Sequence, residues 1–382
     1  MTRVLLALAL FATACGSAGA ALPDAFVATI SAVEVTPDTL TVKRGISAPT
    51  QLTAKLALSN STTLDITNNA TWASSDSTVA TVAPSGIVTP LSVGTTMITA
   101  TYEGVTSTAS AVTVAATTMI LSDIGKSQIN IYDAYTDGPT LRQIVGANTT
   151  LSTPWGLTVY HDELFVTETN GAIDVFPATA AGDVAPTRRI TGLGNAYGIA
   201  IYKDEIYVAT GAKILVFPVA ATGAVAATRT IASTAGALAN AFSVAVYKDE
   251  IYATNYTSVM VFPTPADGDV APTRKIMGSN TFLTSCYAVF VENDEIYVSN
   301  LSGVRVFLTS SDGDVSPIRN LAGANTALSS ATGVTLLGNE LYVTNAGSTG
   351  THAFPASVTG DAAPTRALTS AGTLNARTIA FY

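Results

Sequence analysis

Apolar and polar residues alternate in short runs along the chain, and after about residue 116 the pattern repeats. The clearest copy is residues 198–229, GIAIYKDEIYVATGAKILVFPVAATGAVAATR. It predicts a strand at Ile199–Tyr202, a polar turn, a second strand at Ile206–Ala209, a third strand ending at Pro218 and a fourth after the Thr-Arg pair. Further copies start 42 or 45 residues apart, at Gly156, Ser243, Ala288 and Gly333.

Four short strands repeated about every 45 residues are typical of a β-propeller blade. Residues 119–142 match a copy without its first strand, and residues 376–382 match a first strand alone. Together they complete one blade. The sequence therefore predicts a six-bladed propeller over residues 116–382, in which the C-terminal strand pairs beside residues 119–124 and leaves no free sheet edge.

Residues 32–115 alternate differently, with turns every 8–12 positions, as in a β-sandwich. The runs WASSD, VATV, GIV and GTTMITA begin at Trp72, Val79, Gly86 and Gly94. They resemble the signatures of the group 2 bacterial Ig-like domain. The resemblance implies a spacer or adhesion module on a bacterial surface, and a single Trp in such a strand is expected in the core. The predicted chain is thus all-β.

The first 20 residues have the pattern of an export signal, with Arg3 before an apolar run and small residues after it. Residues 12–15, ATAC, resemble a bacterial lipobox, which makes Cys15 the predicted lipidation site; cleavage after Ala20 is the alternative. Residues 21–31 form a tether. We expect an outer-membrane or cell-surface lipoprotein that contacts the membrane only through its lipid, or alternatively a periplasmic or secreted protein. Cys286 is then a lone thiol, expected to be buried.

Charged residues make up only 12% of the chain, and the net charge is −9. No basic surface for DNA or RNA is expected from this balance, so nucleic acid is excluded as a partner. We expect a monomer.

The repeats resemble the NHL-type propeller family in residues 154–159 (PWGLTV) and 206–210 (IYVAT). This resemblance predicts the fold and leaves the function open, because propellers host binding proteins, lyases and hydrolases alike.

Propeller topology places the start of each first strand and the end of each second strand on the same face. The residues before the first strands are Trp155, Tyr197, Phe242, Tyr287, Thr332 and Arg377. The residues at the ends of the second strands are Asp123, Glu168, Thr210, Asn255, Asn300 and Asn345. Aromatic rings beside directed polar groups suit a sugar or another polar ligand.

We therefore predict a binding protein, with a surface glycan or a protein as ligand, no cofactor and no catalytic residue. The predicted ligand-binding residues are Trp155, Tyr197, Phe242, Tyr287, Arg377, Asn255, Asn300 and Asn345. Two other interpretations stay open. In one, the asparagines serve only their own turns; in the other, the aromatic residues only pack between blades.

The enzyme alternative is a calcium-dependent lactone or ester hydrolase, because six-bladed lactonases of the gluconolactonase type hold calcium with Glu, Asp and Asn oxygens. Asp123 and Glu168 are the candidate metal ligands. The two histidines, His161 and His352, fall in a turn on the opposite face and in a third strand, so no general base is identified.

An arginine recurs at the start of each fourth strand, and an aspartate often precedes it. We expect structural Arg–Asp pairs within the blades. The arginines are Arg142, Arg188, Arg229, Arg274, Arg319 and Arg366, and the aspartates are Asp183, Asp269, Asp314 and Asp361.

Overall fold

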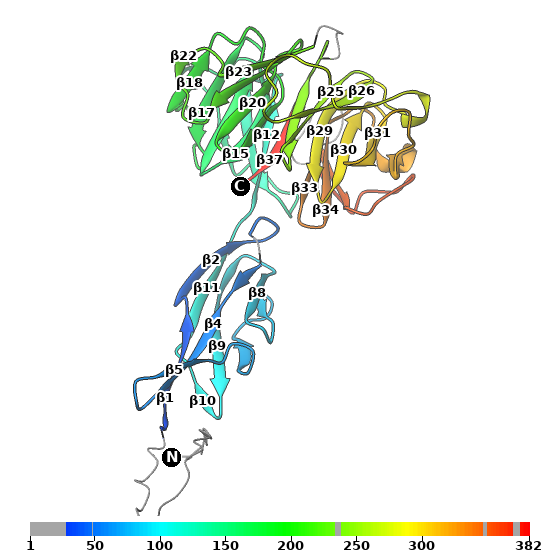
Figure 1. Ribbon diagram of the computed structural model, residues 1–382. Helices are drawn as coiled ribbons and strands as arrows, with labels where there is room; N and C mark the ends of the chain where they lie inside the picture. Colours follow the sequence, from blue (N-terminus) through cyan, green and yellow to red (C-terminus); the bar gives the residue numbers. More distant parts are fainter. Residues whose placement is uncertain (1–27, 48, 234–237, 347–349, 370–374) are drawn as a thin grey trace, which may run out of the picture. The chain divides into compact units, whose positions relative to one another are not determined.

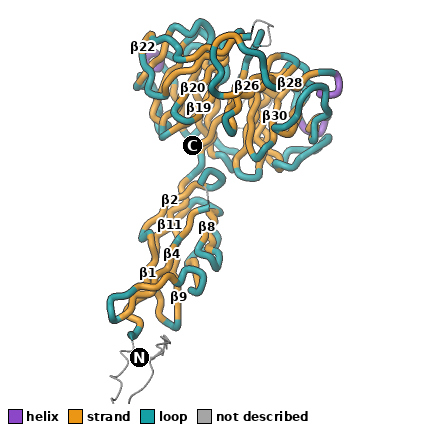
Figure 2. The backbone as a smooth tube through the Cα atoms, viewed as in Figure 1, coloured by secondary structure: helices purple, strands orange, loops and turns teal. Residues whose placement is uncertain are grey.

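The computed structural model describes residues 28–47, 49–233, 238–346, 350–369 and 375–382. The predicted signal, Cys15 and most of the tether lie outside the described residues. The chain divides between Ala116 and Thr117 into two compact units, described separately below. Strands and loops make up both units (Figure 2), apart from three single-turn 3-10 helices in the second, η1 (Ala147–Thr149), η2 (Ser279–Thr281) and η3 (Ala324–Thr326). The prediction of an all-β chain is confirmed.

The first unit contains three sheets around one apolar core. The first sheet has the strand order β1 (Ile30–Thr36), β4 (Thr53–Leu58), β5 (Thr63–Asp65). The second has the order β10 (Val105–Thr106), β9 (Gly94–Tyr102), β11 (Ser110–Ala115), β2 (Thr39–Lys43), and β6 (Thr71–Ser74) also pairs with β9. The third has the order β3 (Thr50–Gln51), β8 (Ile87–Pro90), β7 (Ala80–Val82). The alternating apolar residues of these strands, such as Val33 and Val35, face the core. Trp72 packs against that core, as predicted, and its Nε1 donates to the carbonyl of Thr67 at 2.9 Å.

The second unit contains six antiparallel sheets (Figure 1). We call it the six-sheet unit. From the innermost strand outwards the sheets are β37 (Ala376–Phe381), β12 (Thr118–Asp123), β13 (Gln128–Asp133) and β14 (Arg142–Ile144); β15 (Pro154–Tyr160), β16 (Glu163–Glu168), β17 (Ala172–Pro177) and β18 (Arg188–Thr191); β19 (Ile199–Tyr202), β20 (Glu205–Ala209), β21 (Ile214–Pro218) and β23 (Arg229–Ala232); β24 (Ser243–Tyr247), β25 (Glu250–Asn255), β26 (Ser258–Pro263) and β28 (Arg274–Met277); β29 (Cys286–Glu292), β30 (Glu295–Asn300), β31 (Gly303–Leu308) and β32 (Arg319–Ala322); and β33 (Ala331–Leu337), β34 (Glu340–Asn345), β35 (Thr351–Pro355) and β36 (Arg366–Leu368).

The second and third strands of each sheet are buried on both faces and are mostly apolar, because neighbouring sheets cover both faces. One core cluster, for example, joins Tyr207 and Val216 of the third sheet to Ile251 and Phe262 of the fourth. A short, continuously apolar run is the expected sequence of a strand buried in this way. The core of this unit therefore lies between the sheets.

The innermost strands contact one another in chain order, and β37 contacts both β15 and β33. β37 also pairs antiparallel with β12, with Met119 opposite Phe381 and Leu121 opposite Ile379. The two incomplete copies of the repeat thus form one four-stranded sheet, as predicted. Within the described residues no sheet closes on itself.

Among the described residues, five of the six outer strands pair with a segment of the next sheet. Two of the fourth strands pair in parallel with a short strand from the next sheet's loop: β18 with β22 (Gly223–Ala224), and β23 with β27 (Gly268–Asp269). Three others make a single parallel bridge to the next sheet, as Ile144 does with Gly182. These contacts leave fewer unpaired backbone groups for association with other chains.

The predicted Arg–Asp pairs are wrong. In five of the sheets the third strand separates the recurring arginine from the glutamate that begins the second strand; the glutamate lies opposite the last residue of the third strand, and the arginine lies opposite a residue two positions earlier. Across this strand the five arginines bind the glutamate of their own sheet: Arg188–Glu163, Arg229–Glu205, Arg274–Glu250, Arg319–Glu295 and Arg366–Glu340. Asp183, Asp314 and Asp361 instead accept backbone hydrogen bonds from Asn148, Asn280 and Asn325 of the preceding sheet.

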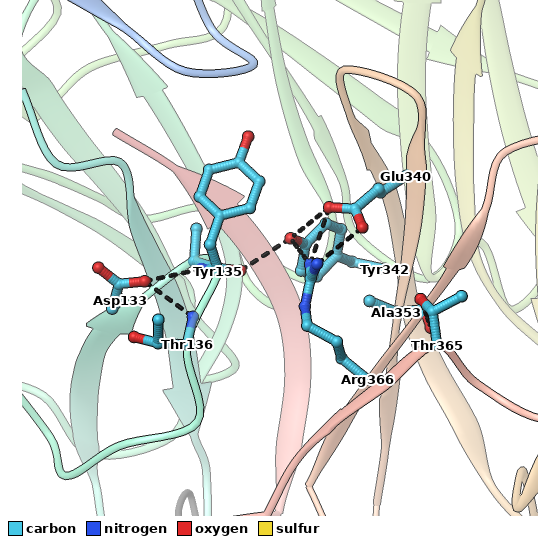
Figure 3. Close-up of polar contacts among 9 residues, drawn as sticks. Asp133, Tyr135, Thr136, Glu340, Tyr342, Ala353, Thr365 and Arg366 are labelled. Atoms are coloured by element: carbon cyan, nitrogen blue, oxygen red, sulfur yellow. Dashed lines mark hydrogen bonds and ion pairs between the residues drawn. The ribbon is translucent and has the colours of Figure 1, made fainter. Parts of the chain in front are cut away.

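These arginines also connect neighbouring sheets. Arg274, for instance, donates to the carbonyl of Thr309 in the next sheet at 2.8 Å. At the junction of the last sheet with the first (Figure 3), Tyr342 donates its hydroxyl to the carbonyl of Ala134 at 2.7 Å. Arg366 lies over the ring of Tyr135, with 5.6 Å from Cζ to the ring centroid. The last sheet is thereby fastened to the first.

Candidate functional site

The residues predicted before the first strands come together at the ends of the innermost strands. Trp155, Tyr197, Phe242, Tyr287 and Arg377, which we call the central cluster, are all half-buried. Strand pairing shifts register beside three of them, at Pro154/Leu157, at Cys286/Ala288 and between the partners of β12 and β37. A bulge of this kind redirects a side chain out of the regular alternation of a strand.

Ring contacts connect the cluster into one chain. The Tyr197 ring meets the rings of Trp155 and Phe242 edge-on, with centroids 5.2 Å apart in both cases. The rings of Trp155 and Phe242 are themselves stacked at 6.2 Å. Edge-to-face and offset-stacked arrangements at these distances are the favoured ones for aromatic pairs. The three rings form a packed surface contributed by three consecutive sheets.

Arg377 extends this chain to Tyr287. Its guanidinium carbon lies 4.9 Å from the ring centroid of Trp155 and 5.9 Å from that of Tyr287. Thr332, the residue between them in the ring order, is short and buried, and its hydroxyl donates to the carbonyl of Ala376 at 2.7 Å. The long Arg377 side chain can therefore reach a ring two sheets away.

Hydroxyl groups fix the backbone under the cluster. The carbonyl oxygen of Trp155 accepts hydrogen bonds from Ser122 at 2.9 Å and from Thr378 at 2.6 Å, and that of Tyr197 accepts one from Thr167. Each bond joins two different sheets. The positions of the rings are thus set by the packing of neighbouring sheets.

Glycine follows the cluster position in two of these sheets because the next sheet comes very close there. A Cβ on Gly156 would lie 2.4 Å from the carbonyl oxygen of Tyr197, and one on Gly198 would lie 2.6 Å from the Cα of Ser243. No real side chain fits at such distances. The glycines with which the sequence repeats begin therefore allow the innermost strands to approach.

Apolar side chains continue the cluster outwards over the loops of the same end of the sheets. The Tyr256 ring contacts that of Phe242 at 5.1 Å and is 45% exposed. Phe282 and Leu301 are 53% and 42% exposed, and the Phe282 carbonyl accepts a hydrogen bond from Asn300. The sequence analysis missed these three because they lie in loops, Tyr256 and Leu301 after second strands and Phe282 after η2, and do not repeat in type.

The asparagine positions serve their own loops. Asn255 Oδ1 accepts hydrogen bonds from the Thr257 N–H and the Ser258 hydroxyl. Asn345 Oδ1 accepts two backbone N–H groups, and its amide donates to the carbonyl of Ala327 at 2.8 Å. Asn300 is bonded in the same manner, to Ser302 and Phe282. Asn255 and Asn300 thus make the bonds within their own turns that were left open as the alternative to ligand binding, whereas the bonds given above for Asn345 go to the loop that precedes β33.

The candidate metal ligands are buried. Glu168 Oε2 accepts three hydrogen bonds, from the N–H and hydroxyl of Ser152 and from the N–H of Thr153, and Asp123 Oδ1 accepts one from the N–H of Gly125. One oxygen of each carboxylate, Glu168 Oε1 and Asp123 Oδ2, has no hydrogen-bond partner. Burial raises the pKa of Glu168 despite those bonds. Over the described residues, no group of three or more His, Cys, Asp or Glu residues could hold a metal ion.

A third buried carboxylate, Asp174, lies close to Glu168. Its side chain is fully buried, and its nearest cation is Arg189, with 3.4 Å from Nε to Oδ1. Burial raises the pKa of Asp174 to about 6, with Glu168 contributing in the same direction. The sequence analysis missed Asp174 because it is a third-strand position, where the other sheets have residues as different as Leu215, Met260 and Arg305.

The remaining titratable candidates are the two histidines and Cys286, which directly precedes Tyr287 of the central cluster. His161 is exposed in a turn, whereas His352 is buried in β35, where burial lowers its pKa. Cys286 is a free, fully buried thiol, as predicted, and burial raises its pKa to about 12. A thiol with so high a pKa is not a nucleophile at neutral pH.

Comparison with known proteins identifies the first unit. Residues 29–114 match the bacterial Ig-like domain (group 2). Domains of this family occur in extracellular or surface proteins, which supports a surface or adhesion-related protein. In the part of the chain that the structure describes, no helix is long and apolar enough to cross a membrane.

No curated protein matches the chain. Among solved structures, a protein of unknown function from Bacteroides caccae is similar, with a TM-score of 0.52 and 10% identity over 70% of this chain and 99% of the other. The computationally designed Ika8 protein is also matched, with a TM-score of 0.43 and 12% identity over 76% of this chain and 86% of that one. The Bacteroides likeness is one of fold alone.

Proposed function

We propose that the chain is an exported, lipid-anchored bacterial surface protein that recognises a polar ligand, a glycan or a protein, through the central cluster. In this proposal the Ig-like domain is a stalk, and the six-sheet unit is a closed six-bladed propeller of the NHL type. The contacts of the innermost strands and the pairing of β37 with β12 support the propeller. Lipidation of Cys15 and export by the first 20 residues belong to the same proposal.

The observation that carries the proposal is the composition of the central cluster. Four aromatic residues and one arginine, contributed by five of the six sheets, are half-buried and contact one another. A purely structural position would be filled by small or aliphatic residues at lower cost, since half-exposed aromatic rings lose part of their burial energy. Aromatic residues and Arg are the types enriched at the energetic centres of binding surfaces.

A screen of the protein against surface glycans and peptidoglycan fragments tests this proposal. We expect a ligand whose binding is lost in the Trp155→Ala and Tyr197→Ala variants and kept in Lys203→Ala, a matched surface change in a turn. Lys203 is exposed, and its ammonium pairs with Asp249 of the next turn and lies over the ring of the neighbouring Tyr202. Equal binding by all of these variants would contradict recognition through the cluster.

The calcium-dependent hydrolase is the second candidate, favoured by the unpartnered oxygens of Asp123 and Glu168. Calcium needs six to eight oxygen ligands with enough negative charge. Calorimetric titration with calcium separates the two functions. A micromolar site that is abolished in the double variant Asp123→Ala, Glu168→Ala would favour the hydrolase; no binding heat is expected from the recognition function.

A further inference from the structure

Arg377 differs from the other arginines that line the sheets. Arg274 and Arg319, for example, bind a glutamate at 2.7 and 2.6 Å. Among the described residues, the Arg377 guanidinium has no carboxylate partner and no hydrogen-bond acceptor; its buried Nε lacks an acceptor, as the Nε atoms of Arg274 and Arg319 do, but those two arginines bind a glutamate through their terminal nitrogens. An arginine carries five N–H donors, and a buried donor without an acceptor is costly.

The surroundings of Arg377 hold the guanidinium in place without neutralising it. It lies between the Trp155 and Tyr287 rings, and its strand is fixed by the hydrogen bond from Thr378 to the Trp155 carbonyl. Burial lowers its pKa, and Tyr287 acts in the opposite direction. A positive charge is therefore presented beside aromatic faces, in a chain whose net charge is −9.

We propose that Arg377, with Trp155 and Tyr287, binds the carboxylate of an acidic sugar. The planar guanidinium forms two parallel hydrogen bonds with a carboxylate, and an aromatic face beside it can stack on the sugar ring. The acidic chain would repel a long polyanion, so an isolated carboxylate, such as that of a terminal acidic sugar, fits better than a repeated one. This inference rests on the proposed function and names the ligand class of the same site.

Two sugars that differ only in the carboxylate test the inference: methyl β-D-glucuronide and methyl β-D-glucoside. Trp155 is one of only two tryptophans, so its fluorescence reports a ligand on its ring, and the Trp155→Phe protein supplies the blank. We expect the glucuronide to bind about 10- to 100-fold more tightly than the glucoside, as for a hydrogen-bonded charge. In Arg377→Gln this difference should disappear while the melting temperature stays near that of the parent.

Arg377→Lys keeps the positive charge but removes the planar guanidinium that forms two parallel hydrogen bonds. This variant should therefore keep only part of the preference for the glucuronide. Equal affinities for the two sugars in the parent protein, or an unchanged preference in Arg377→Gln, would overturn the inference and leave recognition by the aromatic rings standing. Tighter binding of N-acetylglycine, a peptide-like carboxylate, than of the glucuronide would overturn the sugar assignment. A parent protein that binds none of the glycans or peptidoglycan fragments in the screen would instead contradict the proposed function.

Discussion

The guanidinium carbon of Arg377 lies 4.9 Å from the ring centroid of Trp155, although Arg377 is in β37, the last strand of the chain, and Trp155 is in β15, the first strand of the second sheet. They meet because β37 enters the sheet of β12 and contacts β15. The candidate site is therefore complete only when the C-terminal strand is in place. Folding of the six-sheet unit and formation of the site should depend on the same strand.

Deletion of residues 378–382 should disrupt the six-sheet unit. It removes the pairs Met119–Phe381 and Leu121–Ile379 and exposes the edge of β12. Exposed edges associate, so we expect aggregation or loss of cooperative unfolding. The measurement is thermal unfolding of the truncated and parent chains, with Trp72 fluorescence reporting the Ig-like domain as an internal reference. A truncated chain that melts like the parent would show that β37 is dispensable.

Replacement of Asp174 by Asn should stabilise the protein at neutral pH. The folded pKa of about 6 exceeds the ordinary 3.8, so the folded state binds more protons between these values and stability falls as pH rises through this window. Asn removes that loss. At pH 7 we expect a gain of about 1–3 kcal/mol in unfolding free energy, part of the full shift being offset because Arg189 loses its partner.

The control for Asp174 is Asp204→Asn, the same change in an exposed turn. Denaturant unfolding from pH 4 to pH 7 should give a flatter profile for Asp174→Asn than for the parent, and the Asp204→Asn profile shows how much an Asp-to-Asn change in an exposed turn contributes by itself. Identical profiles for the parent and Asp174→Asn would mean that this carboxylate has no raised pKa.

Tyr342→Phe should cost more stability than the matched change Tyr252→Phe. The Tyr342 hydroxyl donates to Ala134 of the first sheet, whereas the Tyr252 hydroxyl donates to Glu250 of its own sheet. Removing the former leaves a carbonyl at the junction unpaired, at a cost of about 1–3 kcal/mol. Chemical denaturation of the two variants gives the comparison. A smaller loss for Tyr342→Phe would argue against this junction as a fastening between the last and first sheets.

The sequence predicted the strands well and their polar partners poorly. The repeat and its incomplete copies were sufficient for the pairing of residues 376–382 with 119–124, because period-two apolar patterns fix which segments are equivalent. The arginine partners were mistaken because nearness in sequence favoured Asp, whereas Arg274 binds Glu250, which lies on the far side of the third strand of the same sheet. The repeat was sufficient to identify the positions of the central cluster. It could not predict contacts such as that of Arg377 with Tyr287, because these depend on the sizes of the side chains between them.

Binding by variants of the cluster tests the central claim most directly. Trp155→Ala should abolish binding of the ligand found by the screen, with a loss of about 2 kcal/mol or more in binding free energy. Its unfolding free energy should fall by less than that of a variant truncated at a buried residue. Phe176→Ala, fully buried between sheets, should lose about 3–5 kcal/mol of stability and keep ligand affinity in the folded protein. The result that would contradict the account is the reverse: parental affinity in Trp155→Ala together with a loss of stability as large as that of Phe176→Ala.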